Sequence, residues 1–133
     1  MVKIPDCVKG VMDELRILSL EIQRMPKNPA ETFGDPAHYP YRSVCTISTH
    51  DMSTLRGWWH EDANLTRRYF YDVLGGWGDY PAEAPGWLCD SIVLKHLLGN
   101  SMLCILSLQD WLSINEEVRY PDADTERINI PAN

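Results

Sequence analysis

Several signatures of common protein classes are missing from this sequence. The four cysteines, at positions 7, 45, 89 and 104, form no Cys-x-x-Cys pair, so neither a zinc site nor a disulfide framework is expected. Lysine and arginine are not clustered and the net charge is -7, which argues against nucleic acid and anionic membranes as partners. Walker-type and Rossmann glycine loops and a Gly-x-Ser-x-Gly nucleophile motif are also missing. A neutral ligand is compatible with what remains.

Targeting and membrane signals are missing as well. The amino-terminal residues show no charged-then-apolar signal pattern, and no apolar run is long enough to cross a bilayer. The cysteines lie in apolar settings such as Val44-Cys45-Thr46, which favours free, buried thiols. Free thiols indicate a reducing compartment, so we expect a cytoplasmic location.

The composition is that of a globular protein. Hydrophobic residues make up 44% and charged residues 23% of the 133 residues, which suits one small domain spanning 1–133. Five tryptophans and six tyrosines are many for this length. Their rings can stack on sugars, but they more often fill a core.

The order of predicted elements indicates an α/β fold with parallel strands. The expected elements are a helix near 5–15, a strand at 17–22, a loop at 26–41, a strand at 43–48, helical turns within 52–61, a helix near 62–74, a break at 75–81, a helix near 87–98 and a strand at 102–108. The last strand is apolar throughout and predicts burial on both faces. Strands separated by helices are typical of parallel βαβ units. Three such strands leave open edges, which suggests part of a larger structure, with an independent domain as the alternative.

The polar cluster Ser48-Thr49-His50-Asp51 follows the second predicted strand. Functional side chains in parallel α/β folds project from the carboxyl ends of strands. A carboxylate there can accept hydrogen bonds from two neighbouring hydroxyls, which suits a polyhydroxy ligand. The competing interpretation, at least equally favoured by spacing, is that Asp51 caps the next helix and His50 packs beneath it. No third ligand completes a metal site, and no cofactor is expected.

Two further groups follow predicted strands. Gln109 or Asp110 could contact the same ligand, although for Asp110 we favour a helix cap before Trp111. At the end of the first strand, Glu21 and Gln23 share one face. Arg24 takes the other face, and a structural ion pair in this group is the favoured interpretation.

Other chemically notable side chains have simpler expected roles. For the Trp58-Trp59 pair we expect one ring in the core, with a sugar platform as the less favoured alternative. His38, His60 and His96 have no partner visible in the sequence and are expected to be surface or packing residues.

Several segments, in order, resemble the 4-alpha-glucanotransferases, the family of amylomaltases and disproportionating enzymes. The longest match is Ser48-Thr49-His50-Asp51-Met52-Ser53-Thr54-Leu55-Arg56-Gly57-Trp58-Trp59. The other segments are Ile4-Pro5-Asp6-Cys7-Val8, Leu18-Ser19-Leu20-Glu21-Ile22-Gln23-Arg24-Met25-Pro26-Lys27, Leu108-Gln109-Asp110 and Glu126-Arg127-Ile128-Asn129. The resemblance covers nearly the whole chain.

The resemblance implies a partial (β/α)8 barrel containing strands six, seven and eight at about 17–24, 43–49 and 102–108. It implies retaining transfer of α-1,4-glucan segments between maltooligosaccharides, through a carboxylate nucleophile and an acid/base carboxyl group. By resemblance, Asp51 is a third carboxylate that binds sugar hydroxyls at the cleavage point. His50 would bind sugar beside it, and Gln109 is a further candidate.

The chain departs from the family pattern in one important respect. The nucleophile's arginine-x-aspartate motif and the Gly-Glu-Asp-Leu-Gly-like motif of the acid/base are not found in these 133 residues. Glu14, Glu21 and Glu31 lie in no matching motif. We therefore expect this chain alone to be inactive. The alternative functions are a non-catalytic carbohydrate-binding or structural α/β module and, with little support, a small hydrolase using His50. Self-association through exposed strand edges is also possible.

Overall fold

The structure is a computed structural model, and it describes residues 4–115. The Glu126-Arg127-Ile128-Asn129 segment, one of those that resemble the family, lies outside the described residues.

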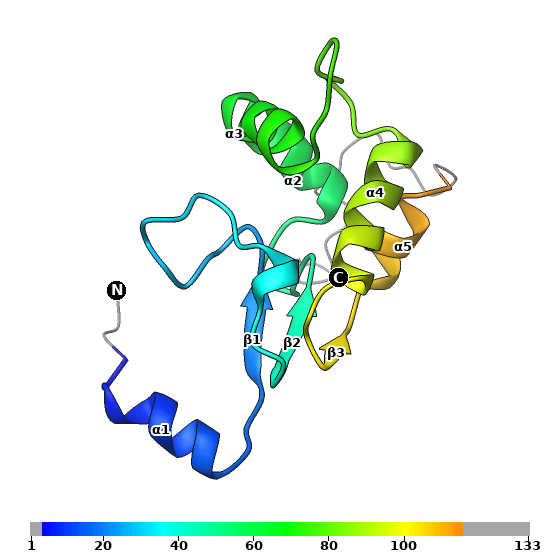
Figure 1. Ribbon diagram of the computed structural model, residues 1–133. Helices are drawn as coiled ribbons and strands as arrows, with labels where there is room; N and C mark the ends of the chain where they lie inside the picture. Colours follow the sequence, from blue (N-terminus) through cyan, green and yellow to red (C-terminus); the bar gives the residue numbers. More distant parts are fainter. Residues whose placement is uncertain (1–3, 116–133) are drawn as a thin grey trace.

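A parallel three-stranded sheet lies at the centre of the described chain. Its strands are β1 (Ser19–Ile22), β2 (Ser43–Thr46) and β3 (Leu103–Cys104), in the order β1-β2-β3. Ser19 pairs with Ser43 in the first ladder, and Val44 pairs with Leu103 in the second. The carboxyl ends of all three strands therefore lie at the same end of the sheet, as the strand arrows in Figure 1 show. The predicted α/β class with parallel strands is confirmed.

The third strand is the main departure from the prediction. The apolar run at 102–108 predicts a long strand buried on both faces, but β3 contains two residues and Leu103 is 45% exposed. β3 pairs with β2 along one edge only among residues 4–115. Its other edge and much of its side-chain surface therefore stay open, and residue 108 already begins a helix.

The helical elements are α1 (Cys7–Glu14), η1 (Pro36–His38), α2 (Leu55–Glu61), α3 (Ala63–Arg68), η2 (Tyr69–Val73), α4 (Gly86–Leu97) and α5 (Leu108–Leu112). Helices α1 to α4 lie close to their predicted ranges, whereas η1 falls within the predicted loop at 26–41 and α5 begins at the last residue of the predicted strand at 102–108. The helix predicted near 62–74 is divided, because α3 continues into η2, which is a π-helix. Side chains cap α2, α3 and α5: Thr54 accepts from Gly57 N, Asp62 from Asn64 N and Ser107 from Asp110 N.

The hydrophobic core lies between β2 and the helices that follow it. Its buried members are Ile47, Leu55, Trp58, Trp59, Tyr69, Phe70, Ala84, Leu88, Cys89, Ile92 and Val93. Helix α4 contributes four of these, more than any other element, and Figure 1 shows it between the α2–α3 pair and α5. The core therefore supports the end of β2 from the helical side.

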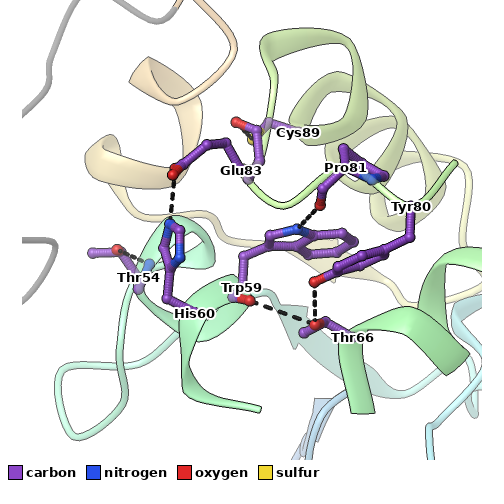
Figure 2. A network of polar contacts seen from close by, with 10 residues as sticks. Thr54, Trp59, His60, Thr66, Tyr80, Pro81, Glu83 and Cys89 are labelled. Atoms are coloured by element: carbon purple, nitrogen blue, oxygen red, sulfur yellow. Dashed lines mark hydrogen bonds and ion pairs between the residues drawn. The ribbon is translucent and has the colours of Figure 1, made fainter. Parts of the chain in front are cut away.

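A polar network around Trp59 holds the helices together (Figure 2). The indole Nε1 of Trp59 donates to Pro81 O at 2.8 Å, and its ring stacks on Tyr80 with centroids 5.4 Å apart. Thr66 Oγ1 lies 2.7 Å from the Tyr80 hydroxyl. Both Trp58 and Trp59 are buried, at 5% and 1% exposure, so the expectation of a single core ring is wrong. The reason is that Trp58 packs against Phe33 and Tyr69 on the opposite side.

The region around α1 is much more exposed to solvent than the helical core. Helix α1 has no buried residue, and Val11, Leu15, Ile17 and Leu20 are each about half exposed or more. In Figure 1, α1 lies well apart from the helical side of the molecule. No helix within residues 4–115 is long and apolar enough to span a membrane.

The cysteines and histidines adopt several different environments. All four cysteines are free, but only Cys45 and Cys89 are buried, so the expected burial is half right. Burial raises the pKa of the Cys104 thiol to about 12, with Cys45 beside it. His38 and His60 pair with Asp35 and Glu83 at the surface, whereas His96 is buried.

Candidate functional site

The candidate site is a loop, residues 47–54, that joins β2 to α2. Ile47, Ser48, Ser53 and Thr54 are buried at its two ends, whereas His50 and Asp51 are exposed at its crest. Thr54, not Asp51, caps α2. Asp51 therefore does not cap the helix and His50 does not pack beneath it, since Thr54 already satisfies the amide of Gly57.

His50 and Asp51 lie beside each other at the crest. His50 Nε2 is 3.1 Å from Asp51 Oδ2, with side-chain exposures of 74% and 69%. The Asp51 amide also donates to Thr49 Oγ1 at 3.4 Å. An exposed imidazole and carboxylate in contact present both a donor and acceptors to solvent. This is an arrangement that can bind adjacent hydroxyl groups of a ligand.

A pocket of about 370 Å³ opens beside the crest. Its lining residues are Arg24, Met25, Asp51, Met52, Ser53, Trp58, Glu61 and Leu65. Two carboxylates, Asp51 and Glu61, thus share a pocket with an aromatic ring, a combination that can hydrogen-bond a polar ligand and pack against its apolar face.

The predicted site residues do not all line this pocket. Asp51 does, whereas His50 lies next to it on the crest and Gln109 is half buried in the first turn of α5. Glu61 and Leu65 were not identified from the sequence. Glu61 ends α2 and Leu65 lies in α3, with the extended residue Asp62 between the two helices, so sequence spacing gave no signal that they face the same pocket.

Arg24 reaches the loop from the neighbouring strand. Its guanidinium donates to Ile47 O at 3.1 Å, to Ser53 O at 2.9 Å and to Ser53 Oγ at 3.3 Å. It also lies over the Trp58 ring, 5.2 Å from the centroid. Burial lowers the pKa of the Arg24 guanidinium, and the negative charge of Asp110 offsets part of that effect. Arg24 therefore supports the loop, whereas the sequence favoured a structural ion pair in its group.

Asp110 reaches the same loop from the other side. It is fully buried, and its carboxylate accepts from Ser48 Oγ in a short hydrogen bond and from Leu55 N at 2.9 Å. The expectation that Asp110 caps its own helix is wrong, because Ser107 caps α5 and the Asp110 carboxylate accepts from Ser48 and from Leu55 N, at the two ends of the loop, instead.

The remaining polar residues at the end of β1 have structural roles. Glu21 pairs with Lys27 at 2.6 Å, so its partner is not Arg24, the oppositely charged residue of the predicted group. Gln23 Oε1 accepts from the Tyr69 hydroxyl at 2.5 Å, and burial raises the pKa of that tyrosine. Among residues 4–115, no three histidine, cysteine, aspartate or glutamate side chains gather to hold a metal ion.

The fold and the site define a class of protein. Parallel strands alternate with helices, and polar side chains gather beyond the strands' carboxyl ends, as in α/β enzymes that bind ligands at that edge. The solved structure of an amylomaltase from Streptococcus agalactiae in complex with acarbose matches the whole chain with a TM-score of 0.68, at 15% identity and over 24% of that protein. This likeness shows the fold of a partial barrel.

Sequence comparisons identify the family. The family model described as 4-alpha-glucanotransferase matches residues 2–133, and the chain belongs to this family. It is 41% identical over 130 residues to a 4-alpha-glucanotransferase DPE2 of Oryza sativa subsp. japonica, covering 98% of this chain and 14% of that protein. It is 28% identical to a 4-alpha-glucanotransferase of Chlamydia trachomatis, covering 96% of this chain and 24% of that protein. The chain thus spans a quarter or less of the length of these relatives.

Proposed function

We propose that this chain is a carboxy-terminal segment of the catalytic barrel of a 4-alpha-glucanotransferase. The observation that carries the proposal is the match of the family model over residues 2–133, together with the exposed Asp51 at the rim of a pocket. The parent enzyme would transfer α-1,4-glucan segments between maltooligosaccharides with retention of configuration. A cytoplasmic location fits the four free cysteines.

In this proposal, the crest residues contact the sugar at the cleavage point. The Asp51 carboxylate accepts hydrogen bonds from two adjacent hydroxyls, which favours distortion of that ring towards the transition state. His50 lies 3.1 Å from Asp51 and serves a neighbouring hydroxyl. Gln109, on α5, remains a further candidate for contact with the glucan.

The chain by itself is proposed to be catalytically inactive. A retaining transfer needs a nucleophile and an acid/base about 5 Å apart. The motifs that carry these two carboxylates in the family are not found in these 133 residues. Release of glucose from maltotriose by the purified chain, lost in Asp51→Ala, would contradict this part of the proposal.

Sugar binding can be tested separately from catalysis. Acarbose or maltoheptaose is titrated into the chain while tryptophan fluorescence is followed, because Trp58 lines the pocket beside Asp51. We expect a saturable change in fluorescence, with an affinity about tenfold or more weaker in Asp51→Asn, since the acceptor loses its negative charge and one oxygen. Asp79→Asn, the same change on an exposed loop, is the matched control. Equal affinities of Asp51→Asn and the unsubstituted chain would refute the assigned role.

The open strand edges are proposed to support self-association of the isolated chain. β1 and β3 each pair on one side only among the described residues, and Leu20 and Leu103 are about half exposed. Light scattering across a concentration series should show species larger than a monomer. A monomer at every concentration would count against this proposal.

A further inference from the structure

The loop of residues 47–54 is held by two charged side chains from the segments that follow β1 and β3, the strands that flank β2. Arg24 follows β1 by two residues, and Asp110 lies in the first turn of α5, just after β3. Both are far from the loop in sequence, with separations of 23 to 29 residues for Arg24 and 55 to 62 for Asp110. The loop therefore lies between a half-buried cation, Arg24, and a fully buried anion, Asp110.

The contacts fall on the two ends of the loop, on either side of its exposed crest. Asp110 bonds to Ser48 before the crest and to Leu55 N after it. Arg24 likewise bonds to Ile47 O before the crest and to Ser53 after it. Each charged residue thus bridges both ends, and neither contacts His50 or Asp51 by any of these hydrogen bonds.

We propose that Asp110 and Arg24 are positioning residues that set the orientation of the His50–Asp51 crest. Fixing both ends of a short loop restricts the directions in which its crest can point, which lowers the entropy cost of ligand binding. Charge-assisted hydrogen bonds are suited to this role because they are roughly twice as strong as neutral ones. The link to sugar binding rests on the proposed function, whereas the restraint of the loop does not.

Hydrogen exchange of the backbone amides of residues 49–55 tests the restraint directly. In Asp110→Asn we expect exchange at Leu55 and Met52 to be at least about tenfold faster, since a charged acceptor is lost. Arg24→Lys should have a similar effect, because one ammonium group cannot reach acceptors on both ends as the planar guanidinium does. If Asp110→Asn does not fold, Ser48→Ala removes one of the two Asp110 contacts and Ser48→Thr restores the hydroxyl.

A control variant separates positioning from general loss of stability. Thr66→Val removes the hydroxyl that contacts Tyr80 and the Trp59 carbonyl, in the network of Figure 2 and away from the loop. At equal overall stability, adjusted with urea, Thr66→Val should leave exchange at residues 49–55 unchanged. Faster exchange throughout the chain in both variants, or no change in Asp110→Asn, would overturn the proposal.

Ligand affinity supplies the second measurement. Acarbose should bind Asp110→Asn and Arg24→Lys several-fold more weakly than Thr66→Val under the same conditions. A loosened loop with unchanged acarbose affinity would overturn the positioning role. If the unsubstituted chain binds no acarbose, the proposed sugar site fails, while the hydrogen-exchange result still decides whether the two residues restrain the loop.

Discussion

Helices α4 and α1 differ in what surrounds them more than in their sequence patterns. Helix α4 has six buried residues, whereas the shorter α1 has none. Both carry apolar residues at helical spacing, but α4 packs against the core cluster and α1 lies apart from it. An apolar face therefore predicts that a helix has something to bury, and only the fold decides whether a partner is present.

The same contrast separates the two sides of the candidate site. Towards the helices, the loop after β2 is supported by buried Leu55, Trp58 and Asp110. Towards α1, the sheet exposes Ile17 and Leu20. Substitutions on the helical side should therefore change the stability of the site, and equivalent substitutions on the α1 side should not.

The largest effect is expected from truncation in α4. Leu88 is fully buried in the core, so Leu88→Ala should lower the free energy of unfolding by about 2–5 kcal/mol. Leu94→Ala is the matched control, because Leu94 lies on the same helix but is 49% exposed. Urea denaturation of both variants gives the comparison. Similar losses in the two would show that α4 does not have one buried and one open face.

A smaller, pH-dependent effect is expected from His96 on the same helix. Burial lowers the pKa of His96 below its ordinary value of 6.5, although the Ile92 carbonyl partly offsets this. The unfolded chain therefore binds a proton near pH 6.5 that the folded chain does not, so stability falls as the pH drops below that value. Above it, His96 adds no pH dependence. Urea denaturation at a series of pH values should show that the free energy of unfolding falls less steeply below pH 6.5 in His96→Gln than in the unsubstituted chain. An identical fall in the two proteins would argue against a lowered pKa of His96.

The cap of α2 should contribute less. Thr54 Oγ1 accepts from Gly57 N at 3.2 Å, so Thr54→Ala should cost about 0.5–2 kcal/mol of stability. Thr54→Ser keeps the acceptor oxygen and should retain most of the stability that Thr54→Ala loses. Thermal unfolding of the three proteins measures the difference, and an alanine variant as stable as the serine variant would remove the assigned capping role.

The smallest effect is expected on α1. Val11 is 47% exposed and contributes nothing to the core, so Val11→Ser should change stability by less than about 0.5 kcal/mol. Urea denaturation at low protein concentration measures it. A loss of unfolding free energy comparable to that of Leu88→Ala would show that α1 is covered in solution and that the two helices do not differ in burial.

Much of the local structure could be predicted because it depends on short-range patterns. The β-branched run before Ser48 predicts β2, and the break at 75–81 separates η2 from α4 as expected. The apolar run at 102–108 misled the prediction, because burial on both faces requires a neighbour that β3 lacks among residues 4–115. Tertiary context thus overrode the apolar pattern.

The candidate site was predicted in part for a similar reason. The position of Asp51 shortly before α2 allowed the interpretation that Asp51 caps this helix. In the structure the cap is Thr54, three residues further on. Arg24 and Asp110 were both noticed in the sequence, but their contacts with the loop were not expected. Hydrogen bonds across 23 to 62 residues leave no local pattern that sequence spacing could reveal.

The sequence by itself determined the order of strands and helices, the position of His50 and Asp51 after β2, and the family resemblance, because these depend on local periodicity and on motifs. Only the tertiary structure decided that Asp51 faces a pocket with Glu61, and that Arg24 and Asp110 hold the two ends of its loop. The physical reason is that parallel pairing brings the carboxyl ends of three distant strands together, which makes neighbours of residues that the chain keeps far apart.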